Sequence, residues 1–254
     1  MLRFFSEKNI LFLDRVDSTN IYALNLLKNG KVADGTIVIT AEQTSGKGAG
    51  GNKWISESHK NLTFSIIFYP EFLSASSQFL LNKAISLGIC DYLKKVVKKN
   101  PVTIKWPNDI YVDDKKIAGI LIETAINSSF LEYAVVGIGL NINQTNFVGD
   151  IPNPTSLKLI EEKDFNLDHC FYELSECIEN RYLQLKNNEM NELNSAYLNR
   201  LYLYRQKAKY KSGEDIFHAT LIGISDVGRL ILQKENGETK EYNFKEVEFC
   251  LNAK

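Results

Sequence analysis

The sequence predicts an α+β protein with two unequal domains. Its 254 residues allow one large or two unequal domains, and 44% of them are hydrophobic, enough for a sizeable core. Up to about residue 205, apolar strand patterns alternate with helical periodicities, whereas short β patterns separated by turns fill the remainder. We therefore expect a large first domain over residues 1–205 and a small β-barrel over residues 206–254.

The first domain carries both kinds of pattern. Strands are expected where β-branched and other apolar residues gather, at 10–12, 36–40, 62–68, 102–105, 117–122 and 133–137. Helices are expected after the cap residues 17–20, where Asn29-Gly30 ends the helix, and over 76–99, 167–186 and 190–204. In the last two helices tyrosine and leucine recur at helical spacing, which indicates core residues rather than a binding face.

The second domain shows a change of character. Its expected strands are 216–224, 230–233 and 240–244. Asp226-Val227-Gly228 and Asn236-Gly237 separate them as turns. Short strands joined by such turns predict a small barrel.

Composition excludes several classes of protein. The formal net charge of −1 lacks the basic excess of a dedicated nucleic-acid binder. The four cysteines form no Cys-x-x-Cys pair and the three histidines lie far apart, so we expect neither a zinc site nor a disulfide framework. We expect the protein to work in a reducing cytoplasm. No apolar run is long enough to span a bilayer, and residues 1–8 lack the long apolar run that a signal peptide carries.

The stretch from Lys105 to Glu123 is the main candidate site. Pro107 excludes a helix, and the polar run 113–116 joins the flanking strands as a hairpin turn. The hairpin would bring Lys105, Asp109 and Lys116 together, two cations and one carboxylate that suit a phosphate with its magnesium ion. A solvated hairpin is the alternative, but the Lys-Trp-Pro-Asn-Asp run, in which Asn-Asp has no strand-forming value, fits it poorly.

A glycine-rich loop between two strands is the second candidate site. Four glycines between residues 46 and 51 let the backbone approach a ligand and expose N–H groups to an anion. The dinucleotide fingerprint is excluded because a strand follows, not a helix, and the Walker and kinase patterns lack their companion residues. A flexible hairpin tip remains the alternative.

Two further features fit either a structural or a binding role. Ser18-Thr19 suits a helix N-cap, and composition alone favours that interpretation. Gly137 and Gly139 interrupt an apolar strand, which indicates close approach by a ligand or by another backbone.

Three ordered motifs resemble the biotin–protein ligase family. They are Ser18-Thr19-Asn20, the loop from Gly46 to Trp54, and Lys105-Trp106-Pro107-Asn108-Asp109 with Lys116-Ile117-Ala118-Gly119, and a Gly-x-Gly-x-Asn run at 137–141 extends the match. The resemblance implies a mixed sheet flanked by helices, a biotinyl/lipoyl-ligase-like domain related to class II synthetases, and an SH3-like C-terminal barrel. It also implies ATP-dependent formation of biotinyl-5'-AMP and transfer of biotin to a lysine of a biotin carboxyl carrier protein or domain.

The resemblance also implies roles for individual residues. Lys116, Lys105 and Lys47 would be catalytic, and Asp109 would hold magnesium. The implied biotin contacts are Ser18, Thr19, Asn20, Gln43, Lys47, Gly48, Ala49, Lys116, Gly119, Gly137 and Gly139. The implied ATP and adenylate contacts are Lys47, Trp54, Lys105, Asn108 and Asn141.

Two positions depart from the family loop Gly-Arg-Gly-Arg-x-Gly-x-x-Trp. Lys47 keeps the charge of the first arginine but loses its planar fork, and Ala49 loses the second arginine altogether. Weaker retention of the adenylate, or compensation by Lys47 or Lys53, follows as a hypothesis.

Other functions stay open. A lipoate ligase would share the fold and the reaction type, and a non-catalytic biotin sensor is kept open by Ala49. A role as a structural adaptor would not explain why glycines and lysines cluster in these motifs. We expect a cytoplasmic monomer or homodimer that contacts neither DNA nor membrane, because the ligand motif begins at Ser18 and leaves no room for a helix-turn-helix domain before it.

Overall fold

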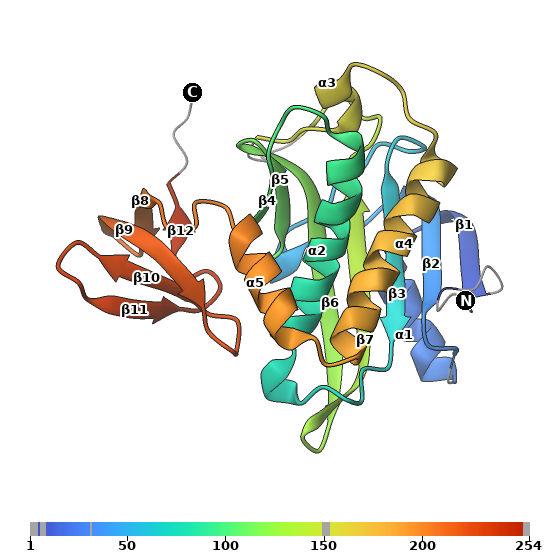
Figure 1. The fold of residues 1–254 in the computed structure, drawn as a ribbon. Helices are drawn as coiled ribbons and strands as arrows, with labels where there is room; N and C mark the ends of the chain where they lie inside the picture. Colours follow the sequence, from blue (N-terminus) through green and yellow to red (C-terminus); the bar gives the residue numbers. More distant parts are fainter. Residues whose placement is uncertain (1–4, 6–8, 31, 149–152, 251–254) are drawn as a thin grey trace.

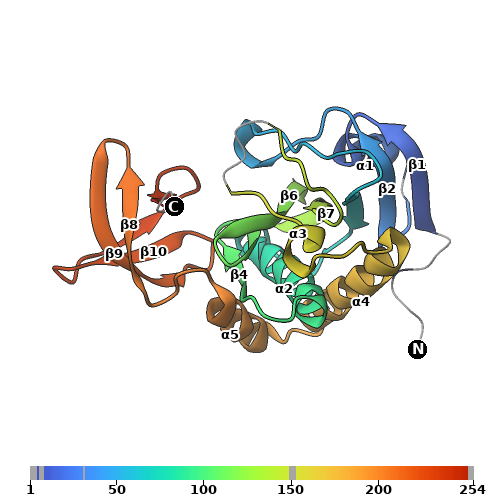
Figure 2. The ribbon, with the colours of Figure 1, turned by 90° about the horizontal axis from the view of Figure 1, so that it is seen from above.

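Two β-sheets, one large and one small, make up the protein (Figure 1). The computed structural model describes residue 5 and residues 9–30, 32–148 and 153–250. The large sheet carries helices on both of its faces. The small sheet lies beside it and is formed by the C-terminal part of the chain (Figure 2).

The large sheet has seven strands in the order β1-β2-β3-β7-β6-β5-β4. These are β1 (Ile10–Val16), β2 (Thr36–Gln43), β3 (Leu62–Phe68), β4 (Val102–Lys105), β5 (Asp109–Val112), β6 (Lys115–Asn127) and β7 (Phe130–Leu140). Strands β1 and β2 run parallel, and the other neighbouring pairs are antiparallel. The sheet is therefore mixed, as the resemblance implies.

Two hydrophobic layers hold the helices on the sheet. Helices α2 (Phe79–Val96), α4 (Leu167–Lys186) and α5 (Met190–Arg200) pack on one face and enclose the main core. Helix α1 (Thr19–Asn29) packs on the other face through Ala23, against Val38, Ile67 and Val135 of the sheet. A short helix, α3 (Leu157–Glu161), follows β7. Central strand β3 is buried along its whole length, because helices cover both of its faces.

The small sheet is antiparallel, with the order β11-β10-β9-β8-β12. Its strands are β8 (Lys207–Ser212), β9 (Asp215–Ile224), β10 (Leu230–Lys234), β11 (Thr239–Tyr242) and β12 (Glu248–Phe249). It forms the expected SH3-like barrel. The division into domains at residue 205 stays a prediction, and the small sheet begins two residues beyond it.

The barrel docks on the large domain through Gly228. The indole Nε1 of Trp106 donates a hydrogen bond to the Gly228 carbonyl oxygen at 2.8 Å. A Cβ on Gly228 would lie 2.5 Å from the Phe79 ring, so only glycine fits between the two parts. The Asp226-Val227-Gly228 turn therefore also forms part of the contact between barrel and sheet.

The predicted central hairpin differs from the structure in two respects. The hairpin predicted between 102–105 and 117–122 is a meander of three strands, because Asp109 starts β5 opposite Lys105. The interpretation of Asn108-Asp109 as lacking strand value was wrong at Asp109: a tight turn at the cis Trp106-Pro107 bond reverses the chain, so the pairing begins immediately after it. The sequence also predicts a loop over residues 151–154, and residues 151 and 152 lie outside the described residues.

Two predicted helices are shorter than expected. The helix predicted over 76–99 begins after a 3₁₀ turn and ends at Val96, because Val97 is already extended ahead of Pro101. The helix predicted over 190–204 ends at Arg200, where Leu201 is extended and forms a bridge with Ile104 of β4. In the described part of the chain, no helix is long and apolar enough to cross a membrane.

Candidate active site

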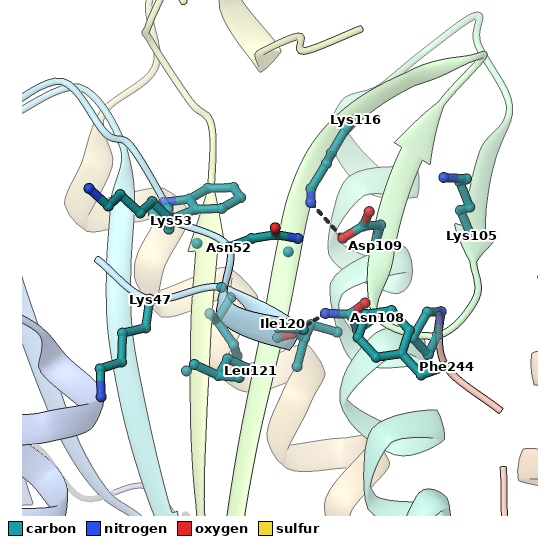
Figure 3. A pocket seen from close by; sticks show the side chains of 18 of the residues that line it. Lys47, Asn52, Lys53, Lys105, Asn108, Asp109, Lys116, Ile120, Leu121 and Phe244 are labelled. Atoms are coloured by element: carbon teal, nitrogen blue, oxygen red, sulfur yellow. Dashed lines mark hydrogen bonds and ion pairs between the residues drawn. The ribbon is translucent and has the colours of Figure 1, made fainter. Parts of the chain in front are cut away.

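A cavity of about 980 Å³ lies where the sheet, helix α1, the glycine loop and the barrel meet. Every site residue implied by the sequence lines it except Asn141. Figure 3 shows its charged part: Lys116 and Asp109 point toward each other, and the Lys47 side chain points away from that pair.

A buried polar cluster forms one end of the cavity. Ser18 occupies the N-cap position of α1, but its side chain makes no capping hydrogen bond, so a cap does not explain it. The backbone N–H of Thr19 donates to Gln43 Oε1 at 2.9 Å, and the Thr19 hydroxyl lies 3.3 Å from the same oxygen. The Asn20 amide donates to Glu123 Oε2 at 2.8 Å. Thr19 and Asn20 are each 3% exposed, so these are desolvated polar groups.

These contacts fix the orientation of the Gln43 amide. Its oxygen accepts from Thr19, so its Nε2 is turned away from the helix, beside Gly46, where a Cβ would lie only 2.3 Å from it. Among the described residues, Nε2 donates no hydrogen bond. Gln43 therefore offers an unused donor at the wall of the cavity.

The glycine loop folds back on itself. The N–H of Trp54 donates to the Gly46 carbonyl at 2.9 Å, and the N–H of Gly48 donates to the Asn52 carbonyl at 2.7 Å. Gly50 has a φ of 66°, in the left-handed region that glycine tolerates. These backbone hydrogen bonds fix the position of Trp54 against the sheet.

The close approach predicted at the strand glycines is made by side chains. A Cβ on Gly139 would lie 2.2 Å from the Trp54 ring, and one on Gly137 would lie 2.2 Å from Asn20 Oδ1. Gly119, opposite Gly139 on β6, leaves room for the same ring. These glycines therefore seat Trp54 and Asn20 in the cavity wall, and the alternative of another packed backbone was wrong.

The other end of the cavity is charged. Lys116 Nζ lies 2.6 Å from Asp109 Oδ1, and 5.8 Å from the centre of the Trp54 ring. Lys105 Nζ lies 5.3 Å from the centre of the Tyr111 ring and 5.4 Å from that of Phe249. Burial lowers the pKa of the Lys105 ammonium, the Asp109 carboxylate opposes this shift, and Lys116 adds to it. The convergence predicted from the sequence is present, carried by β4, β5 and β6.

Two asparagines mainly support this geometry. Asn108 lines the cavity, and its amide donates to the Ile120 carbonyl at 2.7 Å, which closes the turn between β4 and β5 onto β6. Asn141 does not line the cavity. Its amide donates to the Thr155 carbonyl at 2.9 Å, and the Thr155 N–H donates to the Lys116 carbonyl. Asn141 thus holds the segment that crosses β6 at Lys116, and its adenylate contact stays a prediction.

The barrel supplies cavity residues that sequence reasoning missed. They are Phe244, Lys245, Val247, Glu248, Phe249 and Cys250. The Lys245 ammonium donates to the Gly50 carbonyl oxygen, so the barrel also touches the glycine loop. No local pattern marks these residues, because β12 has only two residues and reaches the cavity by docking of the whole barrel.

Comparison with known proteins identifies the family of the chain. The model of the Biotin/lipoate A/B protein ligase family matches residues 12–141. The match covers more than half of the chain, so the chain belongs to the Biotin/lipoate A/B protein ligase family.

Individual relatives narrow the class. The Biotin--[acetyl-CoA-carboxylase] ligase of Paracoccus denitrificans is 26% identical over 89% of this chain and 94% of its own length. The Bifunctional ligase/repressor BirA of Bacillus subtilis is 25% identical over 93% of this chain and 73% of its own length. The structure of the Aquifex aeolicus biotin protein ligase in complex with biotin and ATP superposes with a TM-score of 0.77 at 28% identity, covering 95% of this chain and 98% of that one.

Proposed function

We propose that this protein is an ATP-dependent biotin–protein ligase. One cavity holds the buried polar cluster at one end and two lysines with an aspartate at the other. If the ring of biotin forms hydrogen bonds with the polar cluster, the carboxylate at the end of its flexible chain would lie near the two lysines and the aspartate. That arrangement carries the proposal.

The reaction has two steps. A carboxylate oxygen of biotin attacks the α-phosphorus of ATP, and the bond to the β-phosphate oxygen breaks, giving biotinyl-5'-AMP and pyrophosphate. The amine of a carrier lysine then attacks the acyl carbon, AMP leaves with the electron pair of the broken C–O bond, and the amine loses a proton. Neither step needs a side-chain nucleophile, so positioning and charge stabilisation suffice.

The charged end supplies the stabilisation. Lys116 would contact the biotin carboxylate and the α-phosphate, and Lys105 would contact phosphate oxygens. Both ammonium groups lie in a partly desolvated site, where a charge-assisted contact with a developing negative charge is strongest. The free energy gained by phosphate binding would offset the cost of keeping Lys105 charged.

Magnesium would enter with ATP, as part of the substrate. Asp109 offers one carboxylate, and its Oδ1 is engaged by Lys116. No group of three or more His, Cys, Asp or Glu side chains that could hold a metal ion exists among the described residues. One carboxylate with phosphate oxygens and water matches how Mg²⁺ is commonly held at nucleotide sites.

The polar end favours biotin over lipoate. A cyclic urea carries a carbonyl that accepts hydrogen bonds and two N–H groups that donate them, whereas a dithiolane ring offers neither. A dithiolane here would leave the Gln43 donor buried without a partner, which is the kind of mismatch that gives strong discrimination. The lipoate alternative is therefore the second candidate, and substrate competition tests it.

The acceptor is proposed to be a biotin carboxyl carrier domain in a reducing cytoplasm. The four cysteines are free thiols, which suits that compartment. A monomer or homodimer without a DNA partner completes the proposal.

Transfer of biotin to a purified carrier domain tests the function. Labelling should require biotin, ATP and magnesium, each omitted in turn. Biotin binding without transfer would favour the sensor, and transfer of lipoate instead of biotin would replace the substrate while keeping the reaction type.

A further inference from the structure

Two residues outside the predicted site continue its buried polar cluster. Ser65 on β3 is 0% exposed and does not line the cavity, and its hydroxyl lies 2.6 Å from Asn20 Oδ1 and 2.7 Å from Thr19 Oγ1. Glu123 on β6 accepts a hydrogen bond from the Asn20 amide at 2.8 Å. Five residues from α1 and three strands thus form a continuous chain of hydrogen bonds, in the order Glu123, Asn20, Ser65, Thr19 and Gln43, and the Thr19 backbone N–H makes the last link.

The shape of the sheet makes this chain possible. Ser65 pairs with Gly137 of β7, and the missing side chain of Gly137 leaves the space that Asn20 occupies. Asn20 therefore reaches across β7, from Ser65 on one side to Glu123 of β6 on the other. Any larger residue at 137 would separate the two partners.

The chain of hydrogen bonds has a fixed polarity. The Glu123 carboxylate only accepts, so Asn20 must present its N–H to Glu123 and its oxygen to Ser65. Ser65 has one hydroxyl proton and donates it to Asn20 Oδ1, which can only accept, so the Thr19 hydroxyl is the donor in the 2.7 Å contact with Ser65. The Thr19 backbone N–H remains directed at Gln43 Oε1, which leaves Gln43 Nε2 for the cavity.

We propose that Ser65 and Glu123 are positioning residues that set the donor pattern of the cavity for a cyclic urea. This inference rests on the proposed function and deepens it by assigning the ring specificity to two residues behind the cavity wall. Neither residue touches the reacting atoms, so their effect falls on ring recognition. Lys105 on β4 and Lys116 near the start of β6 would carry the phosphate chemistry at the other end of the cavity.

The test compares adenylate formation by the Ser65→Ala variant and by the native protein while the concentrations of biotin and of ATP are varied separately. Loss of the central hydroxyl should raise the KM for biotin about tenfold while the KM for ATP stays within about twofold, because its hydrogen bonds to Asn20 and Thr19 are lost at the ring end alone. Selectivity for biotin and dethiobiotin, which both carry the urea, over lipoate should fall by a similar factor. Equal rises in both KM values, or an unchanged KM for biotin, would overturn the assignment.

Matched variants separate positioning from folding. Ser86 is also 0% exposed and its hydroxyl is bonded to Asn82 within α2, so Ser86→Ala makes the same chemical change away from the cavity and should leave the KM for biotin unchanged. Glu123→Leu removes the acceptor and should match Ser65→Ala, whereas Glu123→Gln restores an acceptor oxygen and should recover most of the affinity. A result in which Gln is as damaging as Leu contradicts the polarity argument.

Failure of the proposed function is recognised separately. If the native protein forms no adenylate, equilibrium binding of biotin to the native protein and to Ser65→Ala decides the matter. Binding weakened about tenfold by the substitution supports the positioning role in a sensor. No binding by the native protein, or equal binding by both, refutes it.

Discussion

Replacing Lys116 by alanine removes one of two ammonium groups at the charged end of the cavity. Its Nζ lies 2.6 Å from Asp109, and the side chains of both residues are 21% exposed. Loss of one charge-stabilising donor in such a site lowers a rate by roughly a hundredfold, about 2.7 kcal/mol. The substitution also leaves the Asp109 carboxylate uncompensated beside an anionic phosphate, so roughly a hundredfold is the lower bound that we expect for adenylation.

The substitution should affect catalysis far more than stability. The ion pair is partly exposed, and such pairs contribute up to about 1 kcal/mol. Biotinyl-adenylate formation should be followed in single turnover, with thermal unfolding measured in parallel. A loss of less than about threefold would remove Lys116 from its role.

Four further outcomes follow from the same geometry. Because burial lowers the pKa of Lys105, its charge is lost as pH rises through that lowered value, so adenylation should decline at a lower pH than the ordinary lysine pKa would set, and Lys105→Arg should move the decline to higher pH. Gly139→Ala places a Cβ 2.2 Å from the Trp54 ring and should lower the rate of adenylation at least tenfold, roughly the cost of overpacking, measured with biotin in steady state. Ala49→Arg should slow adenylate release about tenfold in a stopped-flow chase, since it adds a charge-assisted contact. Lys245→Ala removes the donor to the Gly50 carbonyl and should speed that release about fivefold.

Each of these outcomes has its own control. Gly223 makes an ordinary 3.7 Å contact in the barrel, so Gly223→Ala should be neutral where Gly139→Ala is not. Identical pH profiles for Lys105→Arg and the native protein would exclude Lys105 as the group that titrates. An unchanged release rate in Ala49→Arg would end the hypothesis of a leaking adenylate, and the same result in Lys245→Ala would show that the barrel does not restrain the loop.

Sequence reasoning succeeded where chemistry and local geometry coincide. Lys105 and Asp109 are paired across a tight turn, and one further turn separates Asp109 from Lys116. Their convergence therefore depends only on residues that are close in the sequence. Strand β3 was predicted because five of its seven residues are apolar, although Thr63 and Ser65 interrupt the run. Strand β8 was missed, since its alternating lysines give no apolar signal and its pairing with β9 holds it in place.

The site residues that sequence reasoning did not predict depend on tertiary contacts. Phe249 and Lys245 lie more than a hundred residues from the sheet residues that they meet, and only docking of the barrel at Gly228 brings them there. Ser65 looks like an ordinary small residue in an apolar strand. Its role emerges only when α1 places Thr19 and Asn20 on top of it.

The positions of the two indole rings make intrinsic tryptophan fluorescence a probe of the cavity. The chain has two tryptophans, Trp54 and Trp106, and both line the cavity. Trp54 lies flat on the sheet glycines beside Lys116, whereas Trp106 is hydrogen-bonded to the barrel. Selective excitation of tryptophan in the Trp106→Phe variant would therefore follow ligand arrival through Trp54 alone, and in Trp54→Phe it would follow movement of the barrel, with no label attached to protein or substrate.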